Sequence, residues 1–310
     1  MPKSRNTDVV LLLVAVVWGA SYLAAKSATA VVPVLVVLFV RYAISTLAGS
    51  AVVAGRGQSH YSRAELRVGA ILGVTQATVL GLETFGVAHT SAANAGVIIS
   101  LTIVLTPLVD SVGRPGGLPI RFYAAGGVCV VAVGLLMVGS GLHPPRVGDL
   151  LILAAAVVRA GHVTLVGRLT KGGDVRPLNL TTIQLAVGSG LFLIPAAAEL
   201  PSLAHAGAAT WADMIFLALF CSVFAFLAQT WAVQRSSASR ASLLLGTEPV
   251  WAVATGVGLG GERLTAAAVA GAALMVAGTT WGQAIERGHR TTSTKDKENI
   301  ACPTTVLTTV

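Results

Sequence analysis

The sequence predicts an all-α integral membrane protein whose ten transmembrane helices form two inverted five-helix repeats. The first observation is composition: 54% of the 310 residues are hydrophobic and only 11% are charged, whereas about 25% are charged in soluble domains. So few charged residues do not cover the surface of a water-soluble fold of this length. The two other observations are ten apolar windows and a set of polar positions that recurs between the halves of the chain.

The ten windows each have the roughly 20 mostly apolar residues that a membrane-spanning helix needs. In the first half they cover residues 9–29, 33–54, 68–88, 91–112 and 120–140. In the second half they cover residues 149–168, 179–197, 212–234, 238–259 and 265–284. Charged residues, Pro or Gly separate neighbouring windows. The chain therefore divides into five spans and five further spans.

The segments outside the spans are short. Residues 141–148 contain paired prolines between glycines and are predicted to link a first repeat (9–140) to a second repeat (149–284). Residues 1–8 form a short cytoplasmic tail. Residues 285–310 are rich in Thr and Lys, and we expect them to be a disordered cytoplasmic tail because they contain too few apolar residues to pack.

The basic residues predict the orientation, because Lys and Arg in short loops are retained in the cytoplasm. With the N-terminus inside, 16 of the 21 Lys and Arg residues are cytoplasmic, three lie outside and two lie within spans. We therefore expect a multi-pass protein of the plasma (inner) membrane with both termini in the cytoplasm. This topology explains the net charge of +8 without a nucleic-acid partner.

The polar, Pro and Gly positions indicate an internal duplication. Gln76 and Glu83 lie seven residues apart, on one helix face, and are matched 146 residues later by Ser222 and Gln229. Further matches at offsets of 141 to 143 residues are Trp18 with Arg159, Arg41 with Gln184, and Pro107 with Pro249. Two copies of a unit with an odd number of spans run in opposite directions, which is the inverted-repeat arrangement.

Several motifs follow one another in a specific order. The first half has Trp18-Gly19, Arg41 within the second span, the stretch from Thr90 to Gly96, and Pro107. The second half has Ser236 to Ser242, then Glu248-Pro249-Val250-Trp251, then Gly261 to Thr265. From about residue 8 to 285 this order resembles the drug/metabolite transporter superfamily, EamA type. The resemblance implies a ten-helix carrier with a central cavity between its repeats, which moves small metabolites, often outward.

The chain departs from that pattern at three places. The first half has Gly113 to Gly117 in place of a Gly-Glu turn, Arg159 replaces a usual aromatic residue, and Glu83 replaces a usual amide. Two of these departures add charge to a span, so they concern the substrate and its coupling rather than the fold.

Polar residues within the spans must face protein or water, because charge at mid-membrane costs at least about 2.5 kcal/mol. Several share helix faces: Trp18 with Tyr22, Thr102 with Thr106 and Asp110, and Arg159 with His162. We expect the following side chains to bind substrate: Trp18, Tyr22, Arg41, Gln76, Glu83, Thr102, Thr106, Asp110, Arg159, His162, Gln184 and Gln229. The alternative is that the charged members pair with one another and only stabilise the fold.

A cavity with both charge signs suits a small amino-acid-like zwitterion or an amphipathic, drug-like metabolite. Arg41 or Arg159 would bind its carboxylate, and Glu83 or Asp110 its amine. The sequence has no Gly-rich phosphate loop for ATP, so a gradient would supply the energy. Glu83 and His162 are the candidates for proton coupling.

The predicted function is secondary active transport of a small metabolite across the plasma membrane, outward, by alternating access, with proton coupling. Pro107 and Pro249 are predicted hinges, because a proline removes a backbone hydrogen bond from a helix. Uptake or facilitated exchange by the same fold is the alternative; a channel is less favoured. No metal-ligand spacing or nucleophile motif predicts an enzyme, a cofactor or a metal. The expected partners are the substrate and membrane lipids, and the sequence leaves monomer and homodimer open.

Overall fold

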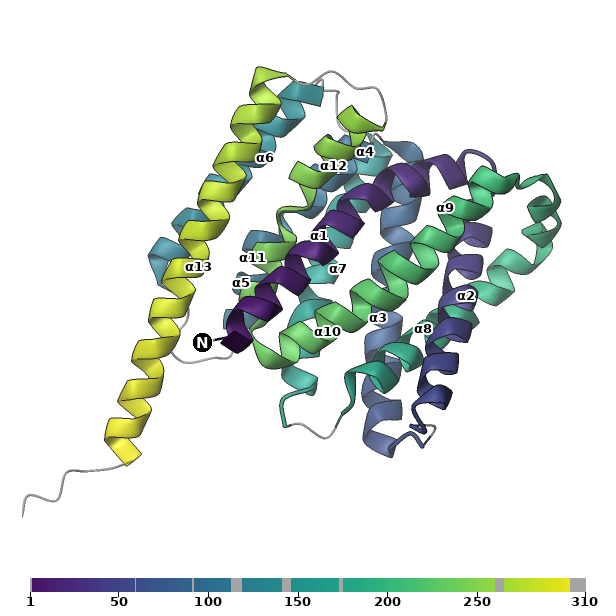
Figure 1. Ribbon diagram of the computed structural model, residues 1–310. Helices are drawn as coiled ribbons and strands as arrows, with labels where there is room; N and C mark the ends of the chain where they lie inside the picture. Colours follow the sequence, from purple (N-terminus) through teal and green to yellow (C-terminus); the bar gives the residue numbers. More distant parts are fainter. Residues whose placement is uncertain are drawn as a thin grey trace, which may run out of the picture.

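The computed structural model describes residues 2–301 apart from 59, 91, 113–118, 141–145, 173–174 and 260–264. These residues form helices and short connections, without a strand among them. The first repeat contains α1 (Pro2–Thr29), α2 (Val34–Gly55), α3 (Arg63–His89), α4 (Ala92–Ile99), α5 (Thr102–Ser111) and α6 (Ile120–Ser140) (Figure 1). The second repeat contains α7 (Val147–Leu169), α8 (Pro177–Ala196), the 3-10 helix η1 (Ala197–His205), α9 (Ala208–Ala218), the π-helix η2 (Leu219–Phe224), α10 (Ala225–Arg235), α11 (Ala238–Leu245), α12 (Glu248–Gly258) and α13 (Ala266–Ala301).

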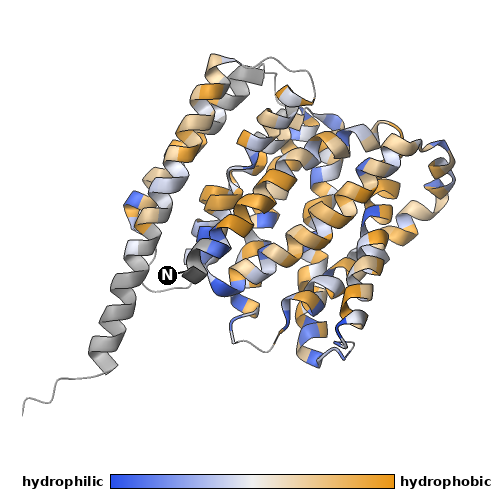
Figure 2. Ribbon diagram, viewed as in Figure 1, coloured by the Kyte–Doolittle hydropathy of each residue, from blue (hydrophilic) through white to orange (hydrophobic). Residues whose placement is uncertain are grey.

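The predicted fold class is confirmed, and each predicted span corresponds to one helix or to consecutive helices. Six segments are long and apolar enough to cross a membrane: α1, α2, α3, α7, α8 with η1, and α9 to α10. The fifth and tenth spans are α6 and α13. Figure 2 shows hydrophobic residues along most of the helices, and hydrophilic residues are most frequent toward the lower end.

The fourth and ninth spans are each divided into two helices, α4–α5 and α11–α12. The interruptions lie at residues 100–101 and 246–247. The N–H of Thr247 donates to the carbonyl of Leu244, three residues back, over 3.2 Å. Pro249 has no N–H to donate to the carbonyl of Leu245, four residues back. The Thr247 hydroxyl also donates to the Leu244 carbonyl over 2.8 Å. Local hydrogen bonds therefore satisfy backbone groups that an uninterrupted helix would pair.

The element bounds give a more accurate register for the repeat. The starts of α4, α5 and α6 recur 146 residues later as the starts of α11, α12 and α13. This register agrees with the predicted match of Glu83 with Gln229, but it places Val253 opposite Pro107. The match of Pro107 with Pro249 is therefore corrected. Pro107 lies in the second turn of α5 and Pro249 in the first turn of α12, so the prolines are not at equivalent depths.

The two repeats interleave and do not form separate bundles. Helix α1 packs against α9 to α12 of the second repeat, and α7 packs in the same way against α3, α4 and α5 of the first. Across the repeats α2 also pairs with α8, and α6 with α13. The main apolar core consequently contains residues from both halves of the chain. A cavity at the centre of this core is bounded by both repeats.

Glycines allow the closest of these contacts. A Cβ atom on Gly19 would lie 2.6 Å from the Cβ of Trp251 and 2.9 Å from the carbonyl oxygen of Glu248, so α1 touches the first turn of α12. A Cβ on Gly73 would lie 2.7 Å from the Cβ of Val187, where α3 meets α8. Small residues permit such close packing of membrane helices. The Gly19 contact holds the start of α12 against α1, which is one of the helices that line the central cavity.

The ends of the chain differ in part from expectation. Helix α13 continues to Ala301, so residues 285–301 are helical where a disordered tail is predicted. The physical reason is that no proline occurs between Thr265 and Cys302 to end the helix. Residues 302–310 and most of the predicted linker, 141–145, lie outside the described residues.

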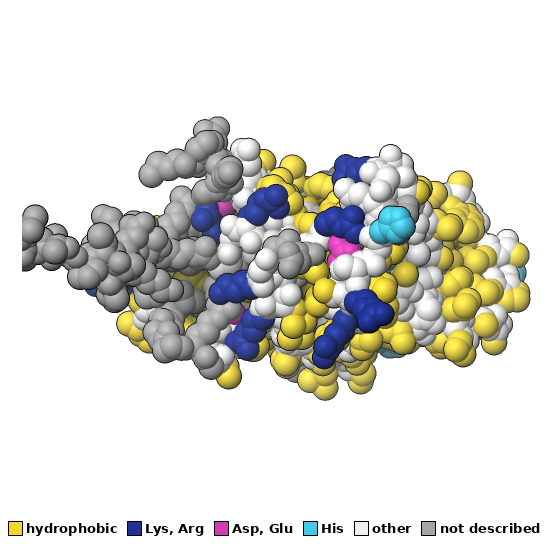
Figure 3. All heavy atoms as spheres, turned by 90° about the horizontal axis from the view of Figure 1, so that it is seen from below, with side chains coloured by type: hydrophobic (Ala, Val, Ile, Leu, Met, Phe, Trp, Pro, Cys, Tyr) yellow, Lys and Arg dark blue, Asp and Glu magenta, His cyan; other side chains and the backbone are white. Residues whose placement is uncertain are grey.

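Basic side chains gather at one end of the molecule, seen from below in Figure 3. Exposed residues at this end, which we call the basic end, are Arg56, Arg63, Arg67, Lys171 and Arg235. The N-terminus and the end of α13 lie toward the same end in Figure 1.

Candidate functional site

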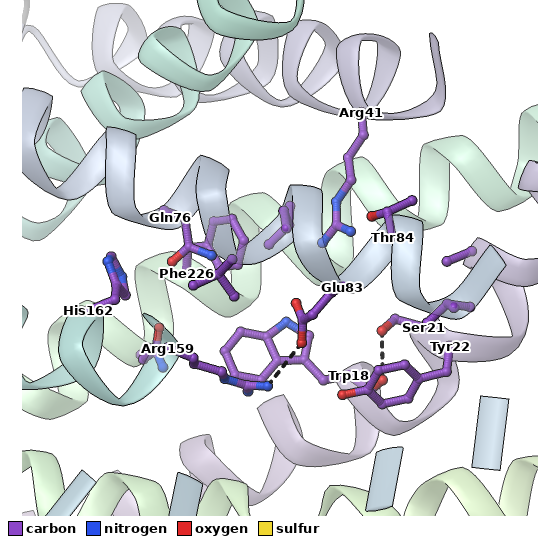
Figure 4. A pocket seen from close by; sticks show the side chains of 15 residues that line it. Trp18, Ser21, Tyr22, Arg41, Gln76, Glu83, Thr84, Arg159, His162 and Phe226 are labelled. Carbon is purple, nitrogen blue, oxygen red and sulfur yellow. Dashed lines mark hydrogen bonds and ion pairs between the residues drawn. The ribbon is translucent and has the colours of Figure 1, made fainter. Parts of the chain in front are cut away.

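The central cavity is lined by α1, α2 and α3 of the first repeat and by α7 and α10 of the second (Figure 4). Eight of the twelve predicted binding residues line it: Trp18, Tyr22, Arg41, Gln76, Glu83, Arg159, His162 and Gln229. Its volume is about 40 Å³. A water molecule needs about 10–15 Å³ on this measure, so the cavity accommodates only a few waters. A metabolite can enter only if the lining helices move apart.

An ion cluster closes one side of the cavity around Arg159 of α7. Its Nη2 donates to Oε1 of Glu248 over 2.5 Å, and its Nη1 lies 3.3 Å from Oε1 of Glu83. The Tyr22 hydroxyl donates to the other oxygen of Glu248 over 3.1 Å. The guanidinium also lies over the ring of Trp18, with Cζ 4.4 Å from the ring centroid. Two carboxylates and an aromatic face thus hold the Arg159 charge.

The other arginine of the cavity, Arg41 of α2, has no carboxylate partner among the described residues. Its Nε donates to the hydroxyl of Ser222 over 2.7 Å, and its Nη2 donates to the carbonyl of Cys221 over 3.4 Å. Both acceptors lie in η2. The Cys221 carbonyl also accepts the indole N–H of Trp18 over 2.9 Å. A π-helix is a rare, widened turn that is frequent at functional sites, and here its carbonyl is bonded by two side chains that line the cavity.

The remaining predicted residues of the cavity are uncharged or weakly basic. His162 lies on α7, and its Nδ1 is 2.8 Å from the hydroxyl of Thr75 on α3. Gln76 of α3 and Gln229 of α10 are both buried, and Gln229 occupies the position that the repeat relates to Glu83. The cavity therefore combines two guanidinium groups, one carboxylate on its wall and amide groups from both repeats.

Four predicted residues lie elsewhere. The Thr102 hydroxyl donates to the Ile99 carbonyl of its own span over 2.9 Å, and Thr106 is fully buried on the same helix. Gln184 lies in α8 where α3 approaches at Gly73. Asp110 lines a different cavity of about 210 Å³, together with Thr170 and Lys171. The predicted polar stripe on the fourth span thus exists but faces away from the central cavity.

Sequence reasoning did not include Glu248 among the binding residues. In the structure Glu248 is the carboxylate closest to Arg159, with its Oε1 2.5 Å from Nη2 of the arginine. Ser21, Thr84 and Phe226 also line the cavity. The available signal was the position of Glu248 as one of few carboxylates within a span. Its partner was not predictable, because α7 and α12 meet only in the folded chain.

Metal binding has no geometric support in the described residues, where His, Cys, Asp and Glu form no group of three or more that could hold an ion.

Comparisons with known proteins agree with this architecture. The EamA-like transporter family matches residues 5–140 and again 146–281. An uncharacterized transporter of Archaeoglobus fulgidus is 24% identical over 274 residues, covering 87% of this chain and 96% of its own. A second from that organism is 24% identical over 276 residues, with 88% and 84% covered. The uncharacterized transporter YyaM of Bacillus subtilis is 28% identical over 173 residues, with 53% and 56% covered.

A solved crystal structure shares the fold at a TM-score of 0.74 with 19% sequence identity, covering 91% of this chain and 98% of the other. The two family matches together span nearly all of the helical part, and their boundary coincides with the predicted linker. The chain therefore belongs to the EamA-like transporter family, of which it contains two repeats.

Proposed function

We propose that this transporter exports a small zwitterionic, amino-acid-like metabolite across the plasma membrane by alternating access, in exchange for protons. The observation that carries the proposal is Arg41, a buried cation that lines the cavity and has no carboxylate partner among the described residues. Burying an unpaired charge is costly. A substrate carboxylate would compensate that cost and form a charge-assisted pair with the guanidinium.

Glu83 supplies the opposite sign on the same cavity. In Figure 4 Glu83 and Arg41 both point into the space between α1, α2 and α3. Arg159 contacts Glu83 at 3.3 Å but is bonded more closely to Glu248 at 2.5 Å. Glu83 is therefore the carboxylate best placed to bind a substrate ammonium group.

The same carboxylate can couple export to a proton gradient. A proton and a substrate ammonium group compete for Glu83, because each neutralises its charge. Competition at one site means that the carrier returns with a proton after releasing the substrate, which is exchange in opposite directions. His162, held by Thr75, is the second candidate for the proton site.

The size of the cavity and the two repeats support alternating access as the mechanism. The cavity of about 40 Å³ must expand to hold a metabolite. The interruptions before α5 and α12 are the places where the fourth and ninth spans can bend, and Pro107 and Pro249 remain our candidate hinges. We place the basic end in the cytoplasm, together with both termini, because basic loops stay on that side.

The test is substrate counterflow in proteoliposomes. Vesicles are loaded with one unlabelled amino acid, and uptake of the same labelled compound is followed; a panel covers apolar, polar and aromatic side chains. Expected is transient accumulation for at least one amino acid, with no accumulation of the matching amine that lacks the carboxylate. A channel or a scaffold gives no counterflow. Equal counterflow of the decarboxylated amine would contradict the role of Arg41, and release from cells with and without the protein tests direction.

A further inference from the structure

A groove of about 440 Å³ lies near the basic end, on the side of α10 opposite the central cavity. Its apolar wall includes Val10 of α1, Leu178 of α8, and Phe224 and Leu227 of the η2–α10 segment. Phe226 and Gln229 line the central cavity instead, so α10 separates the two spaces. The groove is therefore independent of the proposed substrate path, and its volume suits a ligand as large as a drug or a lipid chain.

The rim of this groove is basic. Arg56 and Arg176 line it, and the guanidinium of Arg235 stacks on the ring of Trp231, with Cζ 4.6 Å from the ring centroid. Arg176 is already bound to Glu65, with Nε 2.9 Å from Oε1. Neither Arg56 nor Arg235 forms an ion pair with any residue in the described part of the chain. Arg56 is thus available on the rim of an apolar groove, and Arg235 is available beside Trp231, which also lines that groove.

We propose that this groove binds one anionic phospholipid from the leaflet at the basic end. Its phosphate contacts the guanidinium groups of Arg56 and Arg235, and one acyl chain lies along Phe224 and Leu227. Tryptophan and arginine are the side chains that meet lipid headgroups at a membrane surface, which fits the stacked pair of Trp231 and Arg235. No carboxylate lines the groove among the described residues, so the charge is complementary to an anionic headgroup and not to an amine.

Native mass spectrometry of the purified protein tests the proposal with equimolar phosphatidylglycerol and phosphatidylcholine. Expected are retained adducts that favour phosphatidylglycerol. A basic residue near a membrane surface contributes roughly a fivefold preference for anionic lipid. Arg56→Ala and Arg235→Ala should each reduce the preference by about that factor. Arg67→Ala is the matched control, because Arg67 is exposed at the same end but does not line the groove and, unlike Arg235, is not stacked on Trp231.

A second variant separates a lipid from a free anion. Leu227→Trp fills the apolar wall and leaves the rim arginines intact, so it should abolish the adduct, whereas Leu191→Trp on the exposed face of α8 should not. Excess inorganic phosphate should leave the lipid adduct unchanged. The proposal is overturned if phosphate displaces the adduct, if Leu227→Trp retains it, or if Arg67→Ala lowers the preference as much as the groove variants.

Discussion

Arg41 and Arg159 are equally buried, each with 7% of its surface exposed, and both line the central cavity. Their partners differ completely. Arg159 bonds Glu248 and Glu83, at 2.5 and 3.3 Å, and lies over the ring of Trp18. Within the part of the chain that the structure describes, Arg41 bonds only a hydroxyl and a backbone carbonyl, both in η2. The two arginines are therefore equally buried, but Arg159 contacts carboxylates whereas Arg41 contacts uncharged groups.

The difference assigns separate roles to the two charges. The Arg159 cluster has one cation and two carboxylates, so with both carboxylates ionised it is negative by one charge. The positive charge of Arg41 makes the total charge of these four groups zero, although Arg41 does not contact either carboxylate. We infer that Arg159 chiefly stabilises the fold, while Arg41 remains available to a ligand. The variants below test this division, beginning with the largest expected effect.

Arg159→Ala should reduce the free energy of unfolding by about 3–5 kcal/mol, because it leaves Glu248 buried without its partner. From the sequence alone, loss of transport would be ascribed to a lost substrate contact; the structure predicts that instability causes it. The measurement is thermal unfolding in detergent, followed by the fraction of monodisperse protein. The double variant Arg159→Met with Glu248→Met should recover part of the stability, since apolar replacement of both partners removes the buried Glu248 charge while Glu83 still lacks its cation. Wild-type stability of Arg159→Ala would contradict the assignment.

Arg41→Ala should reduce counterflow of the zwitterionic substrate at least tenfold while costing only about 1–3 kcal/mol in stability, the range for lost hydrogen bonds of a charged group. Transport and unfolding are measured on the same preparation. Gln184→Met is the matched control, because Gln184 occupies the related position in the second repeat but lies outside the cavity. Counterflow at the wild-type rate in Arg41→Ala would remove the proposed carboxylate site.

Glu83→Gln should preserve exchange of substrate across the membrane, with an affinity lowered several-fold, and should abolish accumulation driven by a pH gradient. The amide keeps a hydrogen-bond acceptor for Arg159 but cannot exchange a proton. Labelled substrate is followed with and without an imposed gradient. Glu199→Gln, an exposed carboxylate on η1, serves as the control. Persistent gradient-driven accumulation in Glu83→Gln would transfer the coupling role to another group, with His162 tested next.

Much of the fold was predictable, because a membrane span depends on local apolar length and the inverted repeat on the number of spans. The cavity was predictable where polar residues recur at helical spacing, as for Trp18 with Tyr22 and Gln76 with Glu83. Helical periodicity, however, predicts which residues share a face of a helix. It does not predict which part of the protein that face contacts. Thr102, Thr106 and Asp110 do share a face of α5, yet that helix packs against α7 and α11, and the face does not reach the central cavity.

The pairing of the charges and the register of the repeat needed three-dimensional contacts. Glu248 reaches Arg159 because α1 approaches the start of α12 at Gly19, a contact between distant segments. The match of the two prolines was misleading, because a shift of four residues is about one helical turn and preserves the face of a helix while changing the depth. The interruptions between α4 and α5 and between α11 and α12 were likewise not predictable. An apolar window has the same length whether it contains one long helix or two short ones.

Trp18 links the two arginines, and its replacement by Phe provides the smallest and most discriminating test. Its ring lies over Arg159, and its N–H bonds the Cys221 carbonyl that Arg41 also approaches. Trp18→Phe keeps an aromatic face for Arg159 but removes the N–H, so stability should fall by only about 1 kcal/mol.

Trp18→Leu removes the aromatic face as well and should cost roughly another 0.5–1 kcal/mol. Both variants are compared by thermal unfolding with Phe226→Leu, which alters the neighbouring ring, 6.1 Å from that of Trp18, without touching either hydrogen bond. If Trp18→Phe is as unstable as Trp18→Leu, the indole N–H contributes the whole effect and the ring contributes nothing to Arg159. The carboxylates alone would then hold Arg159, and the contrast with Arg41 would rest entirely on ion pairing.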